Sequence, residues 1–206
     1  METLRKFLQD KFEILVNEID RFEIIDKQLL PYGLKPHTRS VAWILEQVIT
    51  QNTKVYKDLL DINEVEEPLS DLEVWDYKIN FNELDEDLYV NIKVTEFTRP
   101  RRKNDMSSIK KILAFFSENP HAHLLYAVFP FKFKGTEIIF TRFPDTYRSS
   151  SKVITGYYSR MDDFVLNKRN EHLQAFYDVG QVDRDNQEFN KLIKDKAKQK
   201  GILLGL

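Results

Sequence analysis

The hydrophobic pattern changes its spacing once along the chain, near Leu72. Before this point apolar residues recur every three or four positions, and after it they alternate with polar ones. Residues 72–81 and 88–97 both alternate in this way, and the acidic segment 82–87 separates them. Strict alternation is typical of β-strands, and two such runs joined by a short polar segment indicate a hairpin. The sequence therefore predicts an antiparallel strand pair at the centre of the fold.

The register of this hairpin predicts which side chains share a face. If the turn is centred between Leu84 and Asp85, Asp76 lies directly opposite Lys93 and Lys78 lies opposite Asn91. Side chains alternate between the two faces of a strand, so one face is wholly apolar and the other is a compact polar group. The apolar face comprises Trp75, Tyr77, Ile79, Phe81, Leu88, Val90, Ile92 and Val94.

The remaining periodicity places helices and strands around this hairpin. Helical spacing predicts helices over residues 4–30, 38–60, 108–116 and 186–199, and alternation predicts strands over 123–133 and 136–143. Pro130 implies an edge strand or a bulge. The chain of 206 residues suits one domain. We expect an α/β fold over 1–206 with a central mixed sheet flanked by helices, a core at about 38–143, an N-terminal helical pair and a C-terminal loop and helix over 144–206.

Composition excludes several classes of function. The chain has no cysteine, which excludes disulfide scaffolds, thiolate metal sites and cysteine nucleophiles, and its six glycines form no phosphate-binding loop. Its longest apolar run is far shorter than the roughly 20 residues that span a bilayer. We expect a soluble cytoplasmic protein without a membrane partner. The net charge of −2 means that any site for a polyanion is local.

The order helix, strand, strand, helix, strand resembles the core of the PD-(D/E)XK nuclease superfamily, which includes type II restriction endonucleases. The resemblance is carried by Glu46 on the helix, Asp76 in the first strand, the segment 91–93 (Asn-Ile-Lys) in the second, and the helix that follows. It implies a restriction-endonuclease-like core in which Asp76 and Asn91 bind Mg²⁺, Lys93 helps to activate a water molecule and Glu46 supports the site. A hard cation with oxygen ligands suits phosphodiester hydrolysis.

The sequence departs from this family at Asn91, where the family has Asp or Glu. An amide oxygen can coordinate Mg²⁺ but brings no charge. Three explanations stay open: a naturally degenerate site, replacement by another carboxylate such as Glu96 or Asp71, or an inactivating substitution. Asp76 and Lys93 also have a purely structural interpretation as an exposed cross-strand ion pair.

Two loops offer candidate contacts to nucleic acid. The first follows the strand that contains Lys93 and leads to a helix start, where anions bind favourably. The second lies beyond the last predicted strand. Together they contain the candidate DNA-binding residues Arg99, Arg101, Arg102, Lys103, Ser107, Ser108, Arg148 and Lys152.

The resemblance implies a sequence-specific, Mg²⁺-dependent endonuclease that acts as a homodimer on double-stranded DNA, since two-fold symmetry suits a palindromic site. An alternative is a non-catalytic nucleic-acid-binding or protein-interaction domain with a degenerate nuclease-like core. A structural α/β domain also stays open, and the sequence does not separate DNA from RNA or reveal a recognition site.

Overall fold

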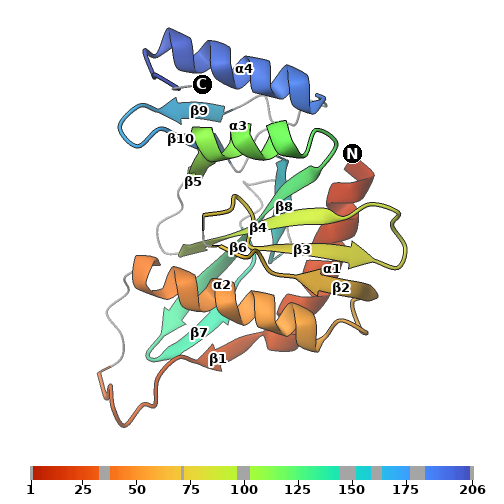
Figure 1. The fold of residues 1–206 in the computed structure, drawn as a ribbon. Coiled ribbons are helices and arrows are strands. Elements are labelled where there is room, and N and C mark those ends of the chain that lie inside the picture. Colours follow the sequence, from red (N-terminus) through yellow and green to blue (C-terminus); the bar gives the residue numbers. More distant parts are fainter. Residues whose placement is uncertain are drawn as a thin grey trace.

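A computed structural model describes residues 2–32, 38–70, 72–96, 103–143, 152–158, 164–176 and 184–204. In these residues the chain forms four helices and ten strands, arranged as a central mixed sheet with helices on both faces (Figure 1). The helices are α1 (Glu2–Ile19), α2 (Thr38–Val55), α3 (Ile109–Glu118) and α4 (Asn186–Gln199). None of these helices is long and apolar enough to cross a membrane.

The strands form two sheets. They are β1 (Arg21–Glu23), β2 (Ile62–Glu66), β3 (Tyr77–Phe81), β4 (Leu88–Glu96), β5 (Lys103–Ser108), β6 (His123–Lys134), β7 (Glu137–Phe140), β8 (Ile154–Tyr158), β9 (Phe164–Asn167) and β10 (His172–Phe176). The large sheet has the order β1-β7-β6-β4-β3-β2, and β8 also pairs with β6; the small sheet has the order β5-β10-β9. In the large sheet β4 and β6 run parallel, whereas the neighbouring pairs are antiparallel. The prediction of a central mixed sheet flanked by helices is confirmed.

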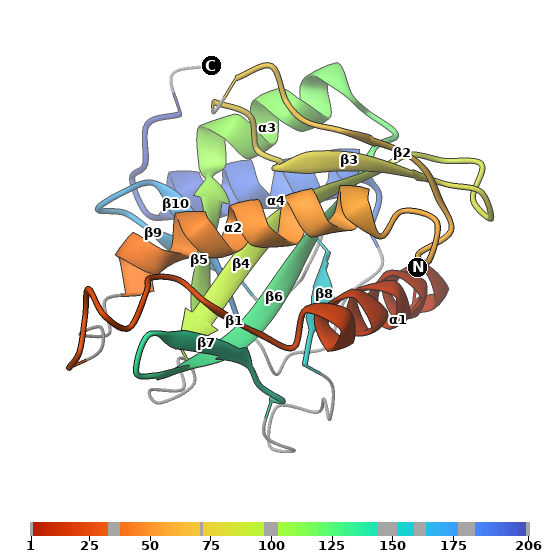
Figure 2. The ribbon, with the colours of Figure 1, turned by 90° about the horizontal axis from the view of Figure 1, so that it is seen from below.

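Two apolar layers cover the faces of the large sheet. Alternation along β6 directs Leu125, Ala127 and Phe129 towards α1 and α2, and Leu124, Tyr126 and Val128 towards α3, α4 and the small sheet. Figure 1 shows α2 on one side of β4 and β6, with α3 and α4 on the other. Figure 2 shows α1 and α2 on the same face of the sheet.

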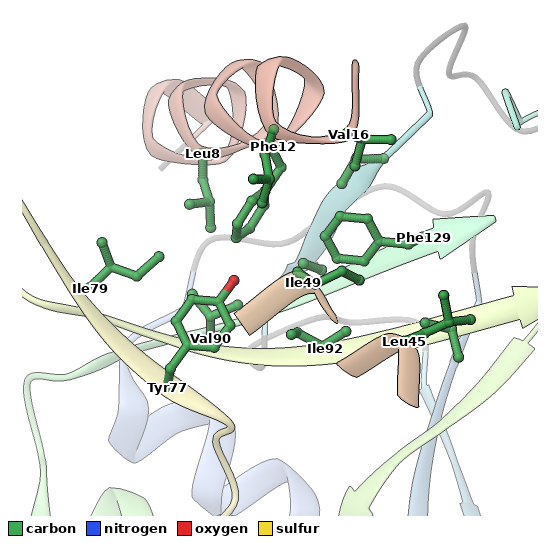
Figure 3. Packing of buried hydrophobic residues seen from close by; sticks show 14 of the residues in the cluster. Leu8, Phe12, Val16, Leu45, Ile49, Tyr77, Ile79, Val90, Ile92 and Phe129 are labelled. Atoms are coloured by element: carbon green, nitrogen blue, oxygen red, sulfur yellow. The ribbon is translucent and has the colours of Figure 1, made fainter. Parts of the chain in front are cut away.

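The first layer holds α2 firmly against β4. Leu45 and Ile49 of α2 are fully buried, and Figure 3 shows them beside Ile92 and opposite the α1 residue Phe12. Burying a large aliphatic side chain contributes about 1.5 to 3 kcal/mol. This packing fixes the position of the residue between them, Glu46, at the flank of the strand.

The N-terminal helix is shorter than the predicted 4–30. It ends at Ile19, because Asp20 has a φ of 41°, and the chain then forms β1, which pairs with β7. Phe22, which fits the helical spacing, instead packs on Phe140 with ring centroids 6.2 Å apart. The second helix likewise ends at Val55 and not at residue 60, and Asp61 takes a φ of 59° before β2.

The segment 144–206 contains more than the predicted loop and helix. The helix α4 has the predicted bounds and begins with a capping box between Asp185 and Glu188. However, β8, β9 and β10 also lie in this segment. β9 and β10 pair with each other locally, whereas β8 pairs with β6 and β10 also pairs with β5. Local periodicity gives no sign of the last two pairings, because β5 and β6 are distant in sequence.

Pro130 lies in the interior of the large sheet, so of the two predicted settings, an edge strand or a bulge, the edge strand is wrong. The β6–β8 register is irregular between Tyr126 and Val128, just before Pro130. It is paired in register with Thr95 of β4, and its carbonyl accepts a hydrogen bond from the Thr141 N–H. On that same side β8 pairs with residues 125–128 of β6 and β7 with residues 131–134. Continuing the β6–β7 register pairs Pro130 with Thr141, so the bond that proline cannot form is the reciprocal one to the Thr141 carbonyl, and the β6–β7 ladder ends at Phe131.

The β3–β4 register differs by two residues from the prediction. Tyr77 pairs with Val90 and Ile79 with Leu88, so continuing the ladder places Asp76 opposite Asn91 and not opposite Lys93. A shift of two residues keeps every side chain on its predicted face, because the side-chain period is two. The cause is a longer connection, in which Phe81 pairs with Ile62 of β2.

Candidate functional site

Asp76 lies at an edge of β4 where its neighbour β3 begins. The Asp76 N–H donates to the Val90 carbonyl (2.8 Å), which is the last backbone contact on this side. The next N–H along the same edge, that of Ile92, donates to Asp76 Oδ2 (2.5 Å), and the Ile92 carbonyl accepts from Lys93 Nζ (3.0 Å). Two ionisable side chains therefore satisfy the backbone groups that a longer β3 would have paired.

The carboxyl of Asp76 is held in a poorly solvated place. Burial raises its pKa above the ordinary value, while the charge of Lys93 and the Ile92 N–H oppose that shift. Desolvation penalises an ionised carboxylate, and only a nearby positive charge or donor offsets the cost. Lys93 is the cation that acts on Asp76.

Glu46 approaches the same charges from α2. Burial raises the pKa of this carboxyl to about 7, the charge of Lys93 lowers it, and the charge of Asp76 raises it. Because α2 is fixed by Leu45 and Ile49, Glu46 is held at the flank of β4 by the core packing. A carboxyl with a pKa near neutrality can both take up and release a proton at physiological pH.

Asn91 is the buried member of the group, with 5% of its surface exposed. Its Nδ2 donates to the Val74 carbonyl (2.7 Å), which lies just before Asp76 in the chain. Its Oδ1 is also buried and accepts no hydrogen bond from the part of the chain that the structure describes. A buried acceptor without a donor costs about 1 to 3 kcal/mol, so this oxygen is suited to a ligand.

Tyr126 of β6 is the neighbour of Asn91 in the parallel ladder. Its hydroxyl is fully buried and donates to Ser107 Oγ (2.9 Å). The Tyr126 hydroxyl proton is thus used in the hydrogen bond to Ser107 of β5. Asn91 Oδ1 therefore does not accept a hydrogen bond from Tyr126. The polar row Asp76, Asn91, Tyr126 and Ser107 runs from the start of β3 across β4 and β6 of the large sheet to β5 of the small sheet.

The residue types fit a hard cation with oxygen ligands. Asp76 and Glu46 supply carboxylates, and Asn91 supplies a buried amide oxygen that has no donor among the described residues. Within the same residues no three His, Cys, Asp or Glu side chains are grouped closely enough to hold a metal ion. A site here would therefore depend on the Asn91 oxygen, and fewer charged ligands mean weaker binding of Mg²⁺.

The four residues of the candidate site come together, whereas only half of the candidate DNA-binding residues lie in the part of the chain that the structure describes. Arg99, Arg101, Arg102 and Arg148 lie outside the described residues, as does Asp71. Lys103 is the first residue of β5, and Ser108 occupies the N-cap position of α3 without a capping hydrogen bond from its side chain.

Ser107 and Lys152 both have partners inside the protein. Ser107 is buried beneath β6 through its contact with Tyr126. Lys152 Nζ pairs with Asp20 Oδ1 (2.9 Å) at the end of α1, and its N–H donates to Glu13 Oε2 (2.9 Å). The structure places Lys152 on the α1 side of the sheet, away from the row that ends at Ser107.

Sequence reasoning missed the roles of Tyr126 and of two backbone groups, the Val74 carbonyl and the Ile92 N–H. Tyr126 belongs to an apolar run, and only the parallel pairing of β4 with β6 places it beside Asn91. A comparison of the sequence with protein-family models and with curated proteins finds no match.

Proposed function

We propose that the protein is a sequence-specific, divalent-metal-dependent DNA endonuclease of the type II restriction enzyme kind, with a restriction-endonuclease-like core. The observation that supports this most directly is the grouping at the open edge of β4. Asp76 lies across from Asn91, Lys93 follows two residues later on the same strand, and Glu46 reaches their charges from α2. This is the arrangement of residue types that metal-assisted hydrolysis of a phosphodiester requires.

Asp76 and Asn91 Oδ1 would hold Mg²⁺, which when bound would supply positive charge at the scissile phosphate and acidify a water molecule. The ammonium of Lys93, fixed by the Ile92 carbonyl, orients that water and stabilises negative charge on the phosphate oxygens. Glu46, with a pKa of about 7, accepts the proton that the attacking water loses. The leaving 3′ oxygen then takes a proton from solvent.

The proposed substrate is double-stranded DNA, bound by a homodimer. Two copies related by two-fold symmetry present two such sites to the two strands of a palindrome. The basic segment 99–103 lies between the end of β4 and the start of β5, close in sequence to both Lys93 and Ser107. Its cations would contact phosphates without reading the sequence.

The second candidate function is a non-catalytic nucleic-acid-binding or protein-interaction domain with a degenerate nuclease-like core. The hydrogen bond from Asn91 Nδ2 to the Val74 carbonyl favours it, because the amide has a structural task that a carboxylate could not perform. In this case the open edge of β4 would bind phosphate or a partner without cutting.

Incubation with mixed-sequence duplex DNA and either Mg²⁺ or Mn²⁺ separates these candidates. Discrete fragments from the parent, absent with Asp76→Asn at equal folded concentration, support the endonuclease. The same assay with Glu18→Gln, an exposed position on α1, controls for loss of surface charge. Retention of DNA on a gel without cleavage under either metal favours the binding domain.

A further inference from the structure

Trp43 is the most unusual exposed residue near the candidate site. It lies on α2, three positions before Glu46, and 67% of its surface is exposed. The other tryptophan, Trp75, is half-buried and packs edge-on against Tyr89 at 5.3 Å. Large indole rings normally lie in a core or an interface, so the exposed ring of Trp43 is a candidate contact for a binding partner.

The position of Trp43 on α2 relates it to the candidate site. Side chains three positions apart in a helix are neighbours, with Cβ atoms about 5 to 6 Å apart. The indole is therefore one turn from the carboxyl on which the charges of Lys93 and Asp76 act. Whatever binds at that carboxyl lies within reach of the ring.

The charges on α2 favour an anionic occupant. Glu46 is the single acidic residue of the helix, whose sequence is TRSVAWILEQVITQNTKV. The exposed ridge that starts at Trp43 continues with Gln47, Gln51 and Lys54, which are amides and a cation. Lys54 Nζ is paired with the Glu67 carboxylate, so a polyanion can lie along Trp43, Gln47 and Gln51 without meeting an acidic residue of α2 other than Glu46.

The segment that leads to Asp76 adds apolar surface of its own. Leu69 and Leu72, in the connection between β2 and β3, are both strongly exposed. Both elements that deliver an acidic residue to the site thus also expose a large apolar side chain. A phosphate group would gain nothing from such surface, whereas the flat face of a base would.

We propose that Trp43 stacks on a base of the nucleic acid, next to the phosphate that contacts Lys93. The inference rests on the proposed function only in taking the bound polymer to be nucleic acid. In a duplex the stacked base is one at an unstacked step or a strand end, as occurs where side chains kink DNA. Trp43 is then a positioning residue, which sets where the backbone crosses the site.

Tryptophan fluorescence tests this contact without requiring cleavage. The protein is titrated in EDTA with a mixed-sequence single strand, a mixed-sequence duplex and a fully abasic oligonucleotide of equal length. Trp75→Phe isolates the Trp43 signal; if that variant fails to fold, the difference between the parent and Trp43→Phe gives the same signal. We expect quenching by the strands that contain bases and little quenching by the abasic one.

Affinity gives a second readout. Stacking on one base is worth about 1 to 3 kcal/mol, so Trp43→Ala should raise the Kd about 5-fold to 150-fold. The slope of log affinity against log salt should stay unchanged, because no phosphate contact is lost. Val55→Ala, an exposed apolar position at the far end of the same helix, is the matched control and should leave the Kd unaltered.

Three results would overturn the proposal. They are equal quenching by the abasic oligonucleotide, a Trp43→Ala variant whose Kd stays within twofold of the parent, and emission that changes with protein concentration but not with nucleic acid. The last would assign Trp43 to contact between copies of the chain. If the parent cleaves DNA with metal but Trp43 fluorescence does not respond to nucleic acid, only this inference is refuted. If bases quench Trp43 but the parent does not cleave DNA, this inference is supported and the nuclease is refuted.

Discussion

Asn91 Nδ2 donates a hydrogen bond of 2.7 Å to the Val74 carbonyl, and both residues are buried. This bond ties the centre of β4 to the segment that carries Asp76. It also fixes the orientation of the amide, since the nitrogen faces Val74 and the oxygen is left for another partner. The residue that departs from the nuclease pattern therefore has a role in the fold as well as in the candidate site.

Asn91→Asp should destabilise the metal-free protein by roughly 1 to 3 kcal/mol, because the Val74 carbonyl loses its donor and a second carboxylate is buried beside Asp76. The loss should be larger at pH 8 than at pH 5, since a protonated carboxyl can still donate to Val74. Mg²⁺ should restore part of the stability. Urea unfolding at both pH values, with and without Mg²⁺, measures these differences.

The exposed position Asn17 on α1 provides the control, since Asn17→Asp adds the same charge without burial. Calorimetric titration with Mg²⁺ should show tighter binding by Asn91→Asp than by the parent, because the cation gains an anionic ligand. If Asn91→Asp binds Mg²⁺ no better and cuts no more DNA than the parent, the binding-domain alternative becomes the better explanation.

Glu46→Gln should change how stability depends on pH. The folded pKa of Glu46 is about 7 against an ordinary value of 4.5, so its contribution to the free energy of unfolding is highest below pH 4.5 and falls as the pH rises to about 7. The variant does not titrate there. The free energy of unfolding of the variant should match that of the parent near pH 4.5 and exceed it above pH 7, by less than about 3 kcal/mol because solvent screens a partly exposed group.

Thermal or urea unfolding from pH 4 to 8 checks this prediction, with Glu18→Gln as the exposed control. Parent and Glu46→Gln curves that stay parallel across the whole range would show that Glu46 is fully solvated in the folded protein. Addition of Mg²⁺ should narrow the difference above pH 7, because a bound cation favours the ionised carboxyl.

The sequence predicted the faces of the β3–β4 pair better than its register. Alternation alone decides that Asp76, Asn91 and Lys93 share a face, and a shift of two residues leaves that assignment intact. The register depends on the connection, where the Asn82 N–H donates to the Asp61 carbonyl and Phe81 pairs with Ile62. These contacts are made with β2 and the residue before it, which lie outside the two alternating segments from which the register was predicted.

The candidate site was predictable in its residue types but not in its supports. Glu46, Asp76 and Lys93 are ionisable residues in otherwise apolar surroundings, which singles them out in the sequence. The Ile92 N–H, the Val74 carbonyl and the Tyr126 hydroxyl support them through backbone geometry and the parallel β4–β6 ladder. The β5–β10 pair of the small sheet was missed for the same reason, since it joins His172 to Ser108 across β6 and β7. The β9–β10 pair is local and lies in the segment that was predicted to be a loop.

The basic segment should contribute phosphate contacts. Replacing two of Arg99, Arg101, Arg102 and Lys103 by alanine should weaken binding to all DNA sequences alike. The slope of log affinity against log salt should become shallower by roughly 0.9 for each lost contact. Fluorescence anisotropy at several salt concentrations measures the slope, with Lys132→Ala at the end of β6 as a control; an unchanged slope would show that the segment faces solvent away from the nucleic acid.

Lys93→Ala should separate catalysis from folding. Lys93 is partly exposed, and substitutions outside the core rarely change the free energy of unfolding by more than about 1 kcal/mol, to which the loss of the charge that opposes the desolvation of Asp76 adds. That comparison belongs at pH 6, where Glu46, with a pKa of about 7, is mostly protonated in the parent. Removing the cation should raise the pKa of Glu46 further, because the charge of Lys93 is what opposes the effect of burial.

Cleavage by Lys93→Ala should be abolished, because the substitution removes the ammonium that the Ile92 carbonyl orients at the open edge of β4. Retained DNA binding, by the anisotropy assay at low salt, would assign the loss to the chemical step. Lys132→Ala again serves as the matched control and should cut as the parent does. Full activity of a folded Lys93→Ala would remove this lysine from the site and, with it, the main support for an endonuclease.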